Sequence, residues 1–215
     1  MEYGEIKTAM EIGALIMSIL LTLLIGLNIR ARKMHIYAWT AAWGLISART
    51  FISLFEPLPL LEAFLRDWLI VFSDILFFIG ITNLLELDLY YRYLIPGLFL
   101  FIHTGVSGIL YLFLESPLYG ATFTNLFSNP LLLFLMFYFF NEGSLRTGNL
   151  GLRVIGVAFL LWGMDFAIFG PLYYGAGYLF AGMCGWTIGF IARVIILLGF
   201  ILLLPKKGIR KITVS

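Results

Sequence analysis

The chain has 215 residues, of which 61% are hydrophobic and only 12% are charged, and its mean hydropathy is +1.00. Soluble domains are about 45–50% apolar and about 25% charged, so this composition excludes an ordinary soluble domain. The single cysteine, Cys184, excludes an intramolecular disulfide and argues against a cysteine metal site. We therefore expect an all-α integral membrane protein of the plasma membrane, with no metal, no cofactor and no nucleic-acid partner.

Seven apolar stretches are each long enough for a transmembrane helix, which needs roughly 20 residues. Unpaired backbone groups are too costly in lipid for any spanning structure except helices and closed barrels, and these continuous runs lack the alternation of barrel strands. They form one predicted membrane domain, residues 1–205, followed by a basic tail, residues 206–215. The acidic start of the chain has no signal-peptide cleavage site after it, so the first span is expected to be retained. In chain order the predicted spans are 8–29, 36–55, 67–86, 93–114, 120–141, 150–173 and 177–204.

The basic residues predict which way the spans run. Most of the 14 lysines and arginines follow the odd-numbered spans, and cytoplasmic loops are the ones enriched in these residues. The N-terminus is therefore expected outside and the C-terminus in the cytoplasm. The residues on the predicted inner side are Arg30, Arg32, Lys33, Arg92, Arg146, Arg153, Lys206, Lys207, Arg210 and Lys211.

Two further patterns concern the shape of the bundle. The connection "EPLPLLEAFLRDW" has two prolines and is interpreted as a loop with a short interfacial helix, while Asn129-Pro130 predicts a kink in the fifth span. Trp-Gly occurs in the second span, "AAWGLISARTF", and again in the sixth, "LLWGMDFAIFG". With one span left between two sets of three, this short match is compatible with a 3+1+3 internal repeat.

Charged residues inside the spans are the main functional signal, because a charge at the bilayer centre costs at least about 2.5–3.5 kcal/mol. Counting about 1.5 Å per residue places Arg49, Asp74 and Asp165 in one layer, about 10 Å below the outer surface. Arg49 is expected to pair with one of the two aspartates. Other polar residues predicted in the outer half are Glu11, Asn125 and Ser107, while His103 and Arg193 lie near the midplane.

Two interpretations of these residues stay open. A buried polar pair often only fixes the packing of helices, and His103 is then an ordinary hydrogen-bonded core residue. Alternatively, the shared depth indicates an outward-facing pocket formed by Arg49, Asp74 and Asp165, with Glu11, Asn125 and Ser107 nearby. Arg193 either extends toward the inner surface or pairs with an acidic residue.

Enzymatic motifs are weak. "GVSGILYL" resembles the start of the serine helix of rhomboid proteases, with Ser107 as nucleophile, but no histidine base follows on a later helix. His103 precedes Ser107 by four residues, so the two can meet on one helix face. Phosphate-loop, dinucleotide and zinc-protease motifs are absent from the sequence, and an intramembrane or lipid-modifying enzyme remains a remote alternative.

Three stretches together resemble a known class of module. They are "HIYAWTAAWGLISARTFISLF", "LFFIGITNLLELDLYYRY", and the region from "GLRVIGVAFLLWGMDFAIFG" to "GFIARVIILLGFILLL". They are similar to the seven-helix membrane sensor modules at the N-terminus of prokaryotic histidine kinases, cyclic-dinucleotide cyclases and related archaeal signalling proteins. The resemblance implies ligand sensing in the membrane and a cytoplasmic output. The chain contains no output domain, so a separate partner or an isolated module is expected.

The sequence thus predicts a membrane sensor or receptor-like module that binds a small or amphiphilic ligand and transmits to a cytoplasmic partner. The oligomeric state is left open, with a homodimer as one alternative. A small proton-coupled transporter with a 3+1+3 arrangement is the second hypothesis, because it would use the same buried charges.

Overall fold

The computed structural model describes residues 3–27, 33–55, 60–175 and 178–203, and within these residues the chain is helical and has no strand. The all-α prediction is confirmed. Seven continuous helical segments follow one another in the described residues, and each overlaps one predicted span along the sequence, while the count of seven membrane crossings stays a prediction. Their parts are α1 (Tyr3–Gly26), α2 (Met34–Ser53), α3 (Leu60–Leu84), η2 (Tyr90–Leu94) with α4 (Ile95–Gly108) and η3 (Ile109–Phe113), α5 (Pro117–Phe123) with η4 (Thr124–Ser128) and α6 (Asn129–Thr147), α7 (Leu150–Gly170) with η5 (Pro171–Gly175), and α8 (Leu179–Leu203).

Five of the described segments are long and apolar enough to cross a membrane: Gly4–Gly26, Tyr90–Phe113, Leu118–Thr147, Leu150–Tyr173 and Leu179–Leu203. This supports assignment as a membrane protein. The other two segments, α2 and α3, have 20 and 25 residues and are not among these five. They carry Arg49 and Asp74, which the fold buries among the other helices.

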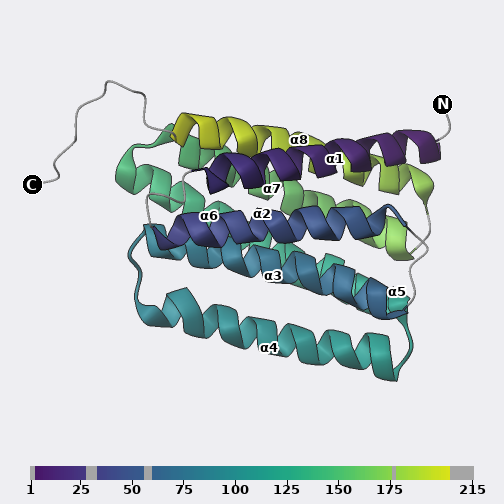
Figure 1. Ribbon diagram of the computed structural model, residues 1–215. Helices are drawn as coiled ribbons and strands as arrows, with labels where there is room; N and C mark the ends of the chain where they lie inside the picture. Colours follow the sequence, from purple (N-terminus) through teal and green to yellow (C-terminus); the bar gives the residue numbers. More distant parts are fainter. Residues whose placement is uncertain (1–2, 28–32, 56–59, 176–177, 204–215) are drawn as a thin grey trace, which may run out of the picture.

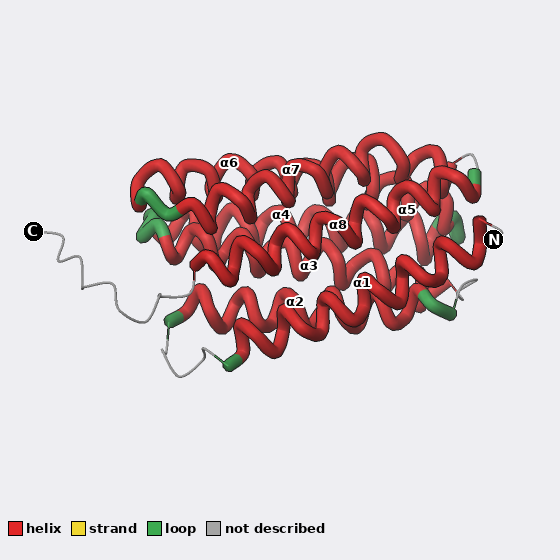
Figure 2. The backbone as a smooth tube through the Cα atoms, turned by 90° about the horizontal axis from the view of Figure 1, so that it is seen from above, coloured by secondary structure: helices red, strands yellow, loops and turns green. Residues whose placement is uncertain are grey.

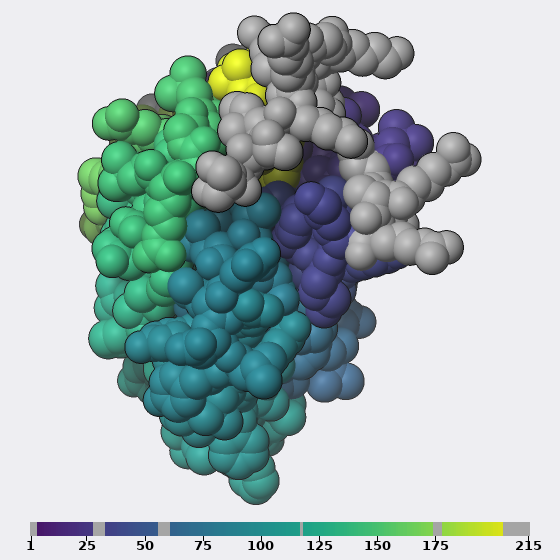
Figure 3. Space-filling view, turned by 90° about the vertical axis from the view of Figure 1, so that its left-hand side faces the viewer, coloured from purple at the N-terminus to yellow at the C-terminus, as the bar shows by residue number. Residues whose placement is uncertain are grey.

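Six helices form a closed ring, and the fourth segment lies outside it. Around the ring, α1 packs on α2, α2 on α3, α3 on α6, α6 on α7, α7 on α8, and α8 on α1 (Figures 1 and 2). Helix α4 packs mainly on α3 and lies apart from the other long helices in Figure 1. In the end-on view of Figure 3, the purple residues of the first helices lie across the bundle from the green residues of α6 and α7.

Aromatic side chains fill the centre of the ring. Trp43 of α2 and Trp162 of α7 stack across it, with ring centroids 6.3 Å apart and planes 13° from parallel. Phe159 continues the stack on Trp162, and Phe77 of α3 packs edge-on against Trp43. Both tryptophans of the repeated Trp-Gly pair are buried, so the repeated dipeptide marks where α2 and α7 meet.

Two prolines follow π-helical turns. Proline has no amide hydrogen, and its ring clashes with the carbonyl four residues earlier, so an α-helix must adjust there. Before Pro130 the amide of Asn129 bonds to the carbonyl of Thr124 five residues back, and before Pro96 the amide of Ile95 bonds to Tyr90 in the same way. A π-turn thus lies next to Asn129-Pro130, where a kink was predicted, and π-turns are a known cause of kinks.

The start of α3 differs from the sequence interpretation. The third span was predicted from residue 67, after a loop with a separate interfacial helix, but α3 already begins at Leu60. Residues 56–59 lie outside the described residues. Arg66 and Asp67, interpreted as charges of an external loop, are instead buried within α3. They form an ion pair with each other, Nε to Oδ1 at 2.8 Å, and this pairing is what permits their burial.

Candidate functional site

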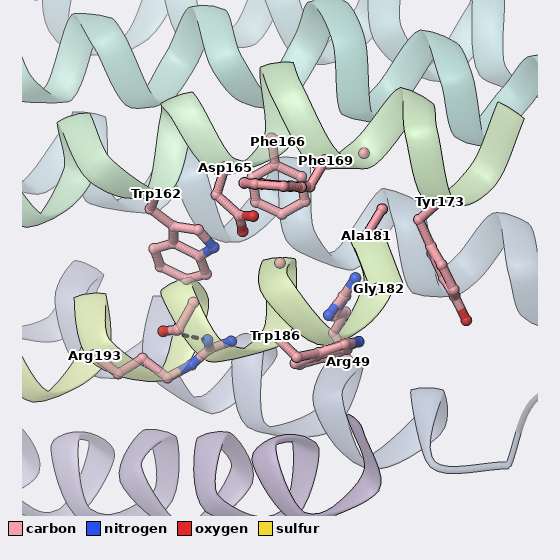
Figure 4. A pocket seen from close by; sticks show the side chains of 13 residues that line it. Arg49, Trp162, Asp165, Phe166, Phe169, Tyr173, Ala181, Gly182, Trp186 and Arg193 are labelled. Carbon is pink, nitrogen blue, oxygen red and sulfur yellow. Dashed lines mark hydrogen bonds between the residues drawn. The ribbon is translucent and has the colours of Figure 1, made fainter. Parts of the chain in front are cut away.

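A cavity of about 50 Å³ lies between α2, α7 and α8, toward the end of the bundle where the chain begins (Figure 4). Counted out to its open mouth, the empty space between the walls is about 460 Å³, which is in the range of sites for small molecules. Arg49, Asp165 and Arg193 bring three charges to its wall, one from each helix. The remaining lining residues are mostly aromatic or glycine: Trp162, Phe166, Phe169, Gly170, Tyr173, Ala181, Gly182, Gly185, Trp186 and Gly189.

Arg193 is held firmly by its neighbours. Its Nε donates to Ser18 Oγ of α1 at 3.0 Å, and its Nη1 donates to the carbonyl of Gly189 at 2.9 Å. The guanidinium carbon lies 4.6 Å from the centre of the Trp162 ring, a cation–π geometry. Arg193 therefore does not extend toward a membrane surface. It lies in the interior, with Asp165 among the charges close enough to act on it.

Arg49 is held less completely. Its guanidinium carbon lies 5.1 Å from the centre of the Trp186 ring, and Asp74 and Asp165 are both near enough to attract it. No N–O distance of 4.0 Å or less joins Arg49 to either aspartate in the described structure, so the expected pairing is not a contact ion pair. The Nε of Arg49 is buried and has no hydrogen-bond partner. A buried donor without a partner costs about 1–3 kcal/mol, so a hydrogen-bond acceptor placed next to this atom would remove that cost.

The two aspartates have different surroundings. Asp165 lines the cavity, and its Oδ1 is buried without a hydrogen-bond partner. Asp74 does not line the cavity: it is fully buried on α3, and neither of its carboxylate oxygens has a hydrogen-bond partner. Arg49 is the positively charged residue that attracts the Asp74 carboxylate. The structure thus brings Arg49 and Asp165 to one wall, as expected, and places Asp74 behind it.

Glycines on α8 leave the space that forms the cavity. A Cβ atom on Gly185 would lie 3.1 Å from Oδ1 of Asp165, and one on Gly189 would lie 3.2 Å from Nη1 of Arg193. One on Gly182 would lie 2.6 Å from the ring of Tyr173. Any larger residue on this face would therefore displace the charged groups or Tyr173.

Glu11 and Asn125 lie beside the cavity without lining it. Glu11 pairs with Lys7 on α1, with 3.1 Å between Nζ and Oε1, and Lys7 lies 5.5 Å from the centre of the Tyr173 ring. Tyr173 is half-buried and lines the cavity, so α1 places the Lys7–Glu11 ion pair near its edge without adding net charge. Asn125 donates to the carbonyl of Ala121 and packs against Gly170 of α7.

Ser107 and His103 lie elsewhere, on α4. His103 Nδ1 is 2.8 Å from Ser128 Oγ, and Ser107 Oγ is 3.3 Å from His103 Nε2, so the two residues meet on one face of the helix. His103, but not Ser107, borders a second, apolar cavity of about 190 Å³ lined by Phe99, Ile102, His103, Phe123, Phe127, Ser128 and Leu131. Ser107 therefore does not contribute to the charged cavity, because α4 lies outside the ring.

Several site residues were not predicted. Trp186 and Trp162, which face the guanidinium groups, were absent from the predicted site. The sequence did offer one signal for the α8 wall, because the spacing of Gly182, Gly185, Gly189 and Arg193 places all four on one face of the helix. A polar contact between α3 and η3, the turn that follows α4, was also missed: Tyr111 donates a hydrogen bond to Asp67, the partner of Arg66. Among the residues that the structure describes, no group of three or more His, Cys, Asp or Glu side chains is placed to hold a metal ion.

Comparisons of the chain with models of known protein families, with curated proteins and with solved structures found no match.

Proposed function

We propose that this protein is a sensor or receptor-like membrane module with seven transmembrane helices, its N-terminus outside and its C-terminus in the cytoplasm. It binds a small or amphiphilic ligand in the cavity between α2, α7 and α8 and transmits to a cytoplasmic partner. The observation that carries the proposal is a cavity whose wall holds Arg49 and Asp165, each with a buried polar atom that lacks a partner. A packing role alone would favour closing these atoms on each other.

The mechanism follows from the origin of the charges. Arg49, Asp165 and Arg193 belong to three different helices of the ring, and Arg193 also bonds to Ser18 of α1. A ligand that bonds to these groups changes the relative free energies of two packings of the helices, and this is the only way a ligand can shift a conformational equilibrium. The resemblance to prokaryotic sensor modules, which transmit from membrane to cytoplasm, agrees with this proposal.

The first test asks whether a molecule occupies the cavity. Gly185→Leu extends a side chain toward Asp165, and Gly105→Leu on α4, where a Cβ would meet no atom within 4 Å, is the matched control. Native mass spectrometry of protein purified in lipid nanodiscs is expected to show a small molecule bound to the wild type and to the control, and at least tenfold less on Gly185→Leu. Equal occupancy in all three proteins would contradict the proposal.

The second test asks whether binding moves the cytoplasmic ends. In a Cys184→Ser background, spin labels at Met34→Cys and Thr147→Cys report the distance between α2 and α6 at the end opposite the cavity. Removal of the bound molecule is expected to change the distance distribution. An unchanged distribution despite complete removal would show binding without transmission.

A small transporter is the second candidate, and a repeated packing pattern favours it. Helix α8 begins 119 residues after α3 and has the same length, 25 residues. The same spacing separates Trp43 from Trp162, Gly80 from Gly199, and Asp74 from Arg193, and all six are buried in the ring. In transporters built from parallel repeats, such as those with 3+1+3 helices, the substrate site lies between the repeats. Uptake of the bound molecule into proteoliposomes under a pH gradient would favour transport, whereas binding without accumulation would favour sensing.

A further inference from the structure

The charges around the cavity include equal numbers of each sign. Arg49 and Arg193 carry the positive charges, and Asp165 in the wall and Asp74 behind Arg49 carry the negative charges. A group of two guanidinium and two carboxylate groups has no net charge when all four are ionised. Such a site gives little net attraction to a ligand with a single charge, because an anion or a cation is attracted by two of the four groups and repelled by the other two.

The two unpartnered atoms in the wall need opposite hydrogen-bonding groups on a ligand. Arg49 Nε is a donor and needs an acceptor, whereas Asp165 Oδ1 is an acceptor and needs a donor. Both side chains are more than nine-tenths buried, at 5% and 7% exposure. Arg49 comes from α2 and Asp165 from α7, so the donor and the acceptor lie on different sides of the cavity (Figure 4). One molecule satisfies both only if it carries an acceptor and a donor at separate atoms.

The rest of the wall is apolar. Phe166 and Phe169 lie beside Asp165 on α7, and the aromatic faces of Trp162 and Trp186 already contact the two guanidinium groups. Hydrophobic and aromatic walls with a few placed polar groups are typical of sites for small molecules. The ligand therefore has an apolar part that packs on the phenylalanines.

Comparison with the corresponding face of α3 shows that the space is specific to α8. At the spacing of 119 residues, Gly182, Gly185 and Gly189 correspond to Ala63, Arg66 and Ile70. All three of those side chains are buried, and Arg66 is in an ion pair with Asp67. The place that is filled by a charged pair on α3 is thus left hollow on α8, next to charges that lack partners.

We propose that the cavity between α2, α7 and α8 binds a small zwitterion with an apolar side chain, of the α-amino-acid class. Its carboxylate accepts from Arg49, and its ammonium group donates to Asp165. Arginine and carboxylate groups match in geometry, and a carboxylate such as Asp165 accepts strong charge-assisted hydrogen bonds. This inference depends on the proposed function, namely that the cavity is a ligand site, and adds the chemical class of the ligand.

The test compares three probes that share one apolar body: L-phenylalanine, 3-phenylpropionate and phenethylamine. Binding to the full chain in lipid nanodiscs is measured by isothermal titration calorimetry, after the co-purified molecules have been removed. We expect L-phenylalanine to bind at least tenfold more tightly than either probe with a single charge. Arg49→Gln and Asp165→Asn are each expected to weaken L-phenylalanine binding at least tenfold, while Arg146→Gln at an exposed position leaves it unchanged.

Each other outcome has a defined meaning. If 3-phenylpropionate or phenethylamine binds as tightly as L-phenylalanine, the site takes a simple anion or a simple cation, and the zwitterion proposal is wrong. If no probe binds but Gly185→Leu still abolishes occupancy by the co-purified molecule, the ligand class is wrong and the proposed function stands. If no probe binds and Gly185→Leu changes nothing, both proposals fail. Because Arg49→Gln could impair folding, thermal unfolding of each variant is measured first, and Gly185→Leu supplies a test that leaves the charges in place.

Discussion

Gly80 shows how closely two helices of the ring approach at a single residue. A Cβ atom at this position of α3 would collide with the indole of Trp39 on α2. That indole donates a hydrogen bond to the carbonyl of Phe77 at 3.3 Å and packs edge-on against Phe200 of α8. Trp39 therefore has no free direction in which to move, and the absence of a side chain at Gly80 is a requirement of the packing.

We predict that Gly80→Ala lowers the free energy of unfolding by about 1–3 kcal/mol, the usual cost of an oversized residue in a packed core. Gly44→Ala on α2 is the control, because a Cβ there meets no atom within 4 Å. Both variants replace a helical glycine by alanine, so the control corrects for helix propensity. Steric-trap unfolding in bicelles measures the difference, and equal stability of the two variants would show that α2 and α3 are not packed as described.

At the same scale, the charged residues show what the sequence could predict. The depth of Arg49 and Asp165 follows from counting residues along a helix, and the structure places both in one wall. The direction in which a side chain points around the helix axis depends on how the helices pack. For that reason Arg193 joins the cavity although it was not assigned to the site, and Asp74 at a similar depth does not.

Helix α4 lies outside the ring and packs mainly on α3, and hydrogen bonds cross this interface. Trp68 Nε1 donates to Thr104 Oγ1 at 2.9 Å, and about two turns further along the segment Tyr111 of η3 donates to Asp67. On the opposite side of this segment Phe101 and Phe113 are 77% and 82% exposed, which suits contact with lipid chains. The polar contacts therefore fix which face of α4 meets the ring.

We predict that Tyr111→Phe weakens this attachment by about 1–3 kcal/mol, because it removes a hydrogen bond to a buried carboxylate whose other oxygen is paired with Arg66. Tyr119→Phe on α5 serves as the control, since Tyr119 is 61% exposed. Hydrogen–deuterium exchange of α4 is expected to rise in Tyr111→Phe and to stay unchanged in Tyr119→Phe. If exchange of α4 is the same in both, the hydroxyl does not hold α4 on α3.

The elements themselves were largely predictable, because a membrane span needs a continuous apolar run and such runs are visible in the sequence. The turn between α6 and α7 has a local cause: Gly148 takes a φ of 66°, and Asn149 caps α7 by accepting a hydrogen bond from the amide of Gly151. The start of α3 was not predictable from hydropathy, because Glu62, Arg66 and Asp67 resemble a loop. The ion pair between Arg66 and Asp67, together with the tertiary hydrogen bond from Tyr111, makes the last two tolerable inside the bundle.

At the scale of the whole molecule, the distribution of charge bears on the direction in which the bundle is inserted into the membrane. The two ends of the bundle differ in charge: Arg146 and Arg153 lie around the connection from α6 to α7, at the end opposite the cavity. Lysine and arginine in short loops favour the cytoplasmic side. If the proposed orientation holds, the cavity faces outward and receives ligands from outside the cell.

We predict that a cysteine at the cavity end reacts with a membrane-impermeant maleimide on intact cells and that one at the opposite end does not. In a Cys184→Ser background, Leu118→Cys at the start of α5 tests the cavity end, and Thr147→Cys at the end of α6 tests the other; both positions are exposed in the structure. Leu118→Cys is expected to label on intact cells, and Thr147→Cys only after the membrane is permeabilised. The reverse pattern would put the cavity on the cytoplasmic side. The ligand would then have to be an intracellular molecule, and the basic residues near α6 and α7 would have to be held outside against the usual charge rule.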